Sequence, residues 1–148
     1  MARGGQSPLI LVAEDDDDDF MLTEQALKQE HLLNPIRRVT DGKELLDYLR
    51  HEGMFGNQDK SPPPALLLLD LNMPRMDGRE ALRAIKSDER LRSLPVVVLT
   101  TSRADEDIVR SYQLGVNSFI TKPVTFQGLV EAVRLLGRYW FELVELPG

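Results

Sequence analysis

The sequence predicts an α/β fold in which five parallel strands form a doubly wound sheet of order 2-1-3-4-5, with helices on both faces. Five short strand-like segments, three of them continuous apolar runs, alternate along the chain with segments whose apolar residues recur at helical spacing. The central run, residues 65–69, contains no polar residue, as expected of a strand that is buried on both faces. The connections are short, which favours parallel strands joined by right-handed helical crossovers.

The first strand and the first helix are separated by a run of acidic residues. Residues 8–13 form a continuous apolar run, which predicts a buried strand that ends on Glu14 and the five aspartates after it. Apolar residues at helical spacing predict a helix over residues 20–30. We expect Asp17 to Asp19 to lie at the N-cap and the positive dipole end of this helix.

The second strand and helix are short. Residues 36–39 follow Asn34-Pro35 and predict a weak strand. Asp41-Gly42 then turns into a helix over residues 43–50, whose leucines fall on one face. Residues 53–64 are rich in Gly, Asn, Asp, Ser and Pro, and they predict a surface loop rather than a domain linker.

The remaining elements follow the same two patterns. Apolar runs indicate the strands, one of them strongly β-branched, and apolar residues at helical spacing indicate the helices. Gly115 suits the C-cap of the fourth helix. The predicted strands are residues 65–69, 95–99 and 117–120, and the predicted helices are residues 78–88, 105–114 and 126–143.

The composition is that of one globular domain. At 148 residues the chain can fill one core, so we expect a flexible N-terminus over residues 1–7 and a single domain over residues 8–148 with an extended C-terminal helix. A net charge of −6 argues against binding to nucleic acid backbones. No apolar stretch approaches the roughly 20 residues of a membrane span, and no signal peptide begins the chain, so we expect a cytoplasmic protein without membrane contact. Without cysteine, disulfides and thiolate metal sites are excluded.

Reactive side chains stand where the predicted strands end. Glu14 and Asp15 follow the first strand, Asp70 the third, Thr100 the fourth and Lys122 the fifth. The carboxyl ends of parallel strands share one edge of the sheet, and in the order 2-1-3-4-5 the first and third strands are neighbours. We therefore expect the three carboxylates to meet.

Such a group of side chains suits phosphoryl transfer. Three crowded carboxylates repel one another, and Mg²⁺ is the cation that best fits a few carboxylates and a phosphoryl oxygen. A lysine ammonium and a threonine hydroxyl, from Lys122 and Thr100, could stabilise the oxygens of the transferring group. Asp70 would then be the nucleophile that forms an aspartyl phosphate.

These residues resemble the receiver domain of two-component response regulators, a flavodoxin-like (βα)5 fold, over nearly the whole chain. The resemblance implies that Glu14 and Asp15 bind the metal, that Asp70 is the phosphoacceptor and that the backbone carbonyl of Asn72 completes the metal site. The run of aspartates leaves the register of the acidic pair open, so Asp15 with Asp16 is the alternative. Met73-Pro74 and Asp77-Gly78 match the turn that follows.

The resemblance extends to the later strand ends. Thr100 corresponds to the switch hydroxyl and Phe119 to the switch aromatic of the family. Lys122 corresponds to its invariant lysine, which stabilises the phosphoryl group with Thr100, and Pro123 follows where the family has a cis peptide between Lys122 and Pro123.

A narrower resemblance is to single-domain regulators that accompany bacterial phytochrome-type histidine kinases. It rests on the loop over residues 53–64, the turn over residues 99–102 and the ending over residues 139–147. It implies a sensor histidine kinase, of phytochrome type, as the partner. We expect output through a downstream protein or a phosphotransfer partner, because no effector domain follows the last helix.

Other functions share some of these sequence features. A phosphorelay intermediate or a phosphate sink would use the same residues. A haloacid-dehalogenase-type phosphatase needs a second aspartate where the chain has Asn72, so we expect no enzyme, only slow self-dephosphorylation. A phosphorylation-independent docking module would not need the full set of reactive residues.

The last helix carries more apolar residues than one core face requires. Val130, Phe141 and Val144 fall off the main apolar stripe. A second apolar surface on a helix at the end of a chain suggests contact with another molecule. We expect a homodimer through this helix.

Overall fold

The computed structural model describes residues 9–28, 35–53, 56, 63–71, 73, 75–76, 78–100, 118–121, 125 and 127–128, with only the backbone for Thr100 and residues 118–121. The expected N-terminal segment 1–7, the helix over residues 105–114 and nearly all of the helix over residues 126–143 lie outside these residues. Within the described part, no helix combines the length and the apolar character that crossing a bilayer would require.

The sheet has the predicted topology. Its five strands pair in parallel in the order β2-β1-β3-β4-β5, so the predicted fold class and strand order are confirmed. Every predicted strand end lies within one residue of the observed one. The strands are β1 (Leu9–Ala13), β2 (Ile36–Val39), β3 (Pro64–Asp70), β4 (Val96–Thr100) and β5 (Ser118–Thr121).

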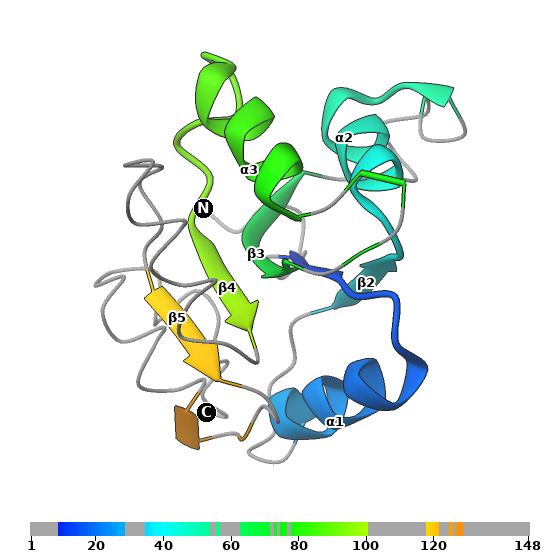
Figure 1. Cartoon of the computed structure of the whole chain (residues 1–148), viewed down its shortest axis with the longest axis vertical. Coiled ribbons are helices and arrows are strands. Elements are labelled where there is room, and N and C mark those ends of the chain that lie inside the picture. The colour runs from blue at the N-terminus through cyan, green and yellow to red at the C-terminus, as the bar shows by residue number, and fades with distance from the viewer. Residues whose placement is uncertain are drawn as a thin grey trace, which may run out of the picture.

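The described helices cover both faces of the sheet. Helix α1 (Asp17–Lys28) lies on one side, and helices α2 (Gly42–Arg50) and α3 (Gly78–Ser87) lie together on the other (Figure 1). The α2 and α3 face has its own core, in which alternate residues of β1, β3 and β4 pack against the helices. That core contains Leu11, Ala13, Leu67, Leu69, Val98, Leu45, Leu49, Leu82 and Ile85, among others.

Strand β3 is the centre of the molecule. It lies between β1 and β4, and Leu66 to Leu69 are all at most 1% exposed. Burying a leucine side chain contributes roughly 1.5–3 kcal/mol relative to leaving it in water. The leucines of β3 point alternately to the two faces of the sheet, and their burial fixes the position and the register of the strand. Asp70 is the last residue of β3.

Helix α1 begins earlier than the sequence predicts. It starts at Asp17 rather than Phe20, and the cap is Asp16, whose Oδ1 accepts a hydrogen bond of 2.9 Å from the Asp19 backbone N–H. The prediction that Asp17 to Asp19 provide the N-cap is therefore wrong, whereas their predicted place at the positive end of the helix dipole is confirmed. They form its first turn, where negative side chains suit the positive end of the helix dipole.

The loop between β3 and α3 closes tightly on the end of β3. The Gly78 N–H donates a 2.9 Å hydrogen bond to the Leu71 carbonyl. A Cβ at position 78 would collide with the Asp70 carbonyl oxygen and would lie 2.6 Å from the Leu71 Cα. Only glycine allows helix α3 to start this close to the backbone of Asp70.

We predict that Gly78→Ala lowers the free energy of unfolding by about 1–3 kcal/mol, because the added methyl group pushes on backbone atoms that cannot turn away. Urea denaturation would measure the loss. Gly56→Ala is the matched control, since Gly56 is exposed and the nearest atom to a new Cβ is the Gly53 carbonyl oxygen at 3.5 Å. Equal stability of the two variants would contradict the prediction.

Candidate functional site

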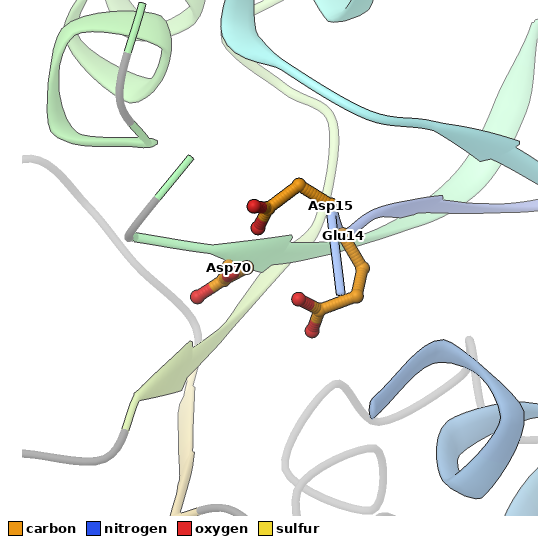
Figure 2. Close-up of side chains that lie close together, drawn as sticks. All are labelled: Glu14, Asp15 and Asp70. Carbon is orange, nitrogen blue, oxygen red and sulfur yellow. The ribbon is translucent and has the colours of Figure 1, made fainter. Parts of the chain in front are cut away.

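Three carboxylates meet at the carboxyl ends of β1 and β3. The register pairs Ala13 with Leu69, so Glu14 and Asp70 follow at the same level of the sheet. One carboxylate oxygen from each of Glu14, Asp15 and Asp70 lies within 4.8 Å of those of the other two. Figure 2 shows the three side chains close together. Glu14 and Asp70 are buried whereas Asp15 is exposed, so solvent reaches the cluster from the side of Asp15.

Strand alternation explains which face these side chains occupy. Ala13 and Leu69 belong to the core beneath α2 and α3. Because successive residues of a strand point to opposite faces, Glu14 and Asp70 turn to the α1 face. The cluster therefore lies at the edge of the sheet near the start of helix α1.

The backbone of Glu14 is held by strand β2 on both sides. Its N–H donates a 2.9 Å hydrogen bond to the Val39 carbonyl. Its own carbonyl oxygen accepts a 2.9 Å hydrogen bond from Nε of Arg38. Its side chain in turn accepts a longer bond of 3.3 Å from the Asp16 N–H at Oε2. The first acid of the cluster is therefore fixed before any ligand arrives.

The loop that follows Asp70 is tied to the turn between β2 and α2. The Gly42 N–H donates a 2.9 Å hydrogen bond to the Met76 carbonyl. Arg75, in the left-handed region at φ 62°, places Nε and Nη2 at 2.9 and 2.7 Å from Oδ2 of Asp41. The buried Asp41 also caps α2, because its Oδ1 accepts a 2.8 Å bond from the Glu44 N–H.

Sequence reasoning found Asp41-Gly42 as a turn but missed this pairing with Arg75. The two residues lie 34 positions apart, and nothing local marks them as partners. The positive φ of Arg75 is unfavourable for a residue with a side chain, and the bonds to Asp41 hold it there. Together, Arg75 and Met76 fix the loop between Asp70 and α3.

The electrostatics of the cluster call for a cation. Three like charges whose oxygens lie within 4.8 Å repel strongly, and two of the three groups are shielded from water. All the side-chain donors are carboxylate oxygens, which hard divalent cations prefer over nitrogen or sulfur ligands. The residues present thus fit a divalent cation held by Glu14, Asp15 and Asp70.

Two other residues predicted from the sequence, Thr100 and Phe119, have a described backbone on the neighbouring strands β4 and β5. Thr100 ends β4 beside β3, because Asp70 pairs with Leu99. Phe119 lies in β5 opposite Val98, and Thr121 pairs with Thr100. Among the predicted site residues, Asn72, Lys122, Pro123, Val130, Phe141 and Val144 lie outside the described residues.

Asp16, the alternative member of the acidic pair, has a different set of contacts. Its Oδ1 caps helix α1 through the Asp19 N–H, and its own N–H donates to Glu14. In the described part of the chain it does not belong to the group of carboxylates that could share one ion.

The sheet order and the acidic cluster at the ends of the neighbouring strands β1 and β3 are the features expected of a receiver domain. The chain matches the response regulator receiver domain over residues 10–134, and it belongs to that family. It is a response regulator of the two-component type.

Relatives extend over nearly the whole chain. Response regulator Rcp1 of Synechocystis is 39% identical over 139 residues, which cover 94% of this chain and 92% of that protein. The probable methanogenesis regulatory protein FilR2 of Methanothrix harundinacea is 43% identical over 141 residues, covering 95% and 88%. The solved structure of the bacteriophytochrome response regulator RtBRR has a TM-score of 0.85 at 44% identity, covering 96% of this chain and 84% of that one.

A relative also bears on the cation. Rcp1 has been solved in a Mn²⁺-bound form, with a TM-score of 0.73 at 38% identity and coverage of 95% of this chain and 99% of that one. The cluster of Glu14, Asp15 and Asp70 fits the binding of a divalent metal by a receiver domain.

We predict that Glu14→Gln and Asp15→Asn each weaken the binding of Mg²⁺ about tenfold or more, because each removes a negative ligand from the cluster. Isothermal titration calorimetry would measure the dissociation constants. Asp16→Asn is the matched control, since asparagine caps helices as well as aspartate does. Unchanged affinity in Glu14→Gln, with losses in Asp15→Asn and Asp16→Asn, would move the acidic pair by one residue, to Asp15 and Asp16.

Proposed function

We propose that Asp70 accepts a phosphoryl group from a sensor histidine kinase while Mg²⁺ is bound by Glu14, Asp15, Asp70 and the backbone carbonyl of Asn72. The observation that carries the proposal is the group of three carboxylates within 4.8 Å in a receiver-domain chain. When bound, Mg²⁺ supplies positive charge to the phosphoryl oxygens.

The transfer is a substitution at phosphorus. An oxygen of the Asp70 carboxylate forms the new O–P bond while the N–P bond to the kinase histidine breaks. The histidine nitrogen keeps the electron pair of the broken bond, and the imidazole leaves as a neutral group because its other ring nitrogen carries a proton. Asp70 is 3% exposed, so little water reaches the carboxylate oxygen that attacks the phosphorus atom.

In this proposal Thr100 and Lys122 bind the phosphoryl oxygens once the group has arrived. A hydroxyl donor and an ammonium act on charge that develops during transfer, which is where such groups contribute most. Movement of Thr100 toward the phosphoryl group would leave space for Phe119, and the surface around β5 would change. Thr100 pairs with Thr121, the residue before Lys122 in the sequence, and this supports a shared role of Thr100 and Lys122 at this edge.

We predict that Asp70→Asn receives no phosphoryl group from a phosphorylated histidine kinase or from a small acyl phosphate, because an amide is not a competent nucleophile. Intact-mass spectrometry would detect the phosphorylated protein. Asp47→Asn is the control for the same chemical change, as Asp47 forms an ion pair with Lys43 on α2. Labelling of Asp70→Asn at the wild-type level would overturn the proposal.

The partner in this proposal is a histidine kinase of the phytochrome type. The names of two similar structures, the bacteriophytochrome response regulator RtBRR and the phosphorylated cyanobacterial phytochrome response regulator RcpA, support that pairing. We propose the cytoplasm as the location of this protein. A role as a phosphorelay intermediate or a phosphate sink is the alternative, and comparing transfer rates from several kinases would distinguish them.

We propose that the protein does not turn over phosphate esters. The signalling family supports this view. A phosphatase of the haloacid-dehalogenase type needs an acid two residues after its nucleophile, and this chain has Asn72 there. Hydrolysis of the aspartyl phosphate by water would then be slow.

We also predict a homodimer through the predicted C-terminal helix, because Val130, Phe141 and Val144 fall off its main apolar stripe in the sequence. Phe141→Asp should weaken self-association about tenfold or more, since aromatic residues dominate such contacts. Analytical ultracentrifugation over a range of concentrations would measure it. Leu22→Asp, at an exposed leucine of α1, is the control. A monomer at all concentrations would refute the dimer.

A further inference from the structure

Arg38 joins three parts of the chain at the edge of the acidic cluster. Its Nε donates a 2.9 Å hydrogen bond to the Glu14 carbonyl at the end of β1. Its Nη1 lies 2.9 Å from Oδ1 of Asp17, the first residue of α1. Its Cζ lies 4.8 Å from the centre of the Phe20 ring. No sequence pattern distinguishes Arg38 for this role, because a second arginine, Arg37, precedes it in the same short strand.

These contacts enclose the turn that carries Asp15. Glu14 and Asp17 stand on either side of Asp15 and Asp16, and one planar guanidinium binds both. A guanidinium has donors in a fixed fork, so it sets the separation of two acceptors in a way that a flexible ammonium does not. The geometry of the turn is therefore set from the neighbouring strand.

Charge alone would give Arg38 the opposite effect. A positive group beside the cluster repels an incoming cation, so its Coulomb contribution weakens metal binding. Nor are all its donors used, because Nη2 is buried and has no hydrogen-bond partner among the described residues. An unmade buried hydrogen bond costs stability. Any favourable effect of Arg38 on cation binding must therefore come from its contacts with the Glu14 carbonyl and Asp17, which position the main chain.

We propose that Arg38 is a positioning residue for the cation site: it holds the main chain at Glu14 and the turn with Asp15 so that the carboxylates are in place before the cation binds. This inference rests on the proposed function of the cluster. Residues that orient metal ligands without touching the metal are commonly worth about tenfold or more in affinity.

The test compares Mn²⁺ binding to three full-length variants by calorimetry and by electron paramagnetic resonance. Arg38→Met keeps an apolar chain over Phe20 but loses the charge and the hydrogen bonds. Arg38→Lys keeps the charge but loses the fork. Arg37→Met removes the same charge from the preceding residue of β2, whose side chain points to the opposite face of the sheet.

Positioning predicts that both Arg38 variants bind Mn²⁺ about tenfold more weakly, while Arg37→Met binds as the wild type does or slightly more tightly. The resonance spectrum of bound Mn²⁺ should also broaden in the Arg38 variants, because the ligands are less uniformly placed. Circular dichroism checks folding, and Arg38→Lys keeps the test valid if Arg38→Met does not fold.

A different pattern would overturn the inference. Tighter binding by Arg38→Met together with unchanged binding by Arg38→Lys would show that only charge matters. Wild-type protein that binds no Mn²⁺ would instead refute the proposed cation site itself. The two failures are thus distinguishable within one experiment.

Discussion

The pairing of β1 with β3 is the constraint on which the site depends. Their register brings Glu14 and Asp70 to the same level, so the sheet forces together carboxylates that would separate in a flexible chain. The apolar strands that do this are buried on both faces, and their burial outweighs the repulsion at their ends. The packing of the core thus keeps the carboxylates of Glu14 and Asp70 close together before a cation binds.

Neighbouring elements then hold what the two strands bring together. Strand β2 binds both backbone groups of Glu14, through Val39 and Arg38. The turn after β2 binds the loop that follows Asp70, through Asp41 and Gly42. Strand β2 is short and weakly apolar, yet it and its turn contact both halves of the site. Its contribution to the molecule is geometric more than hydrophobic.

Sequence reasoning succeeded where periodicity carries the signal. The apolar runs predicted every strand to within one residue, and their order brought Glu14, Asp15 and Asp70 together in advance. It failed where similar residues compete for one place. Five successive aspartates look alike, and Asp16 is the cap because β1 ends at Ala13 and Arg38 binds Asp17. Pairings such as Asp41 with Arg75 depend on tertiary contacts that local patterns do not contain.

The two oxygens of Asp41 have a dynamic consequence. One caps helix α2 and the other holds Arg75 in the loop after β3. The helix and the loop are therefore linked through one side chain, because a displacement of Asp41 would break both contacts at once. A rearrangement of the loop beside Asp70 that moved Asp41 would also uncap the first turn of α2.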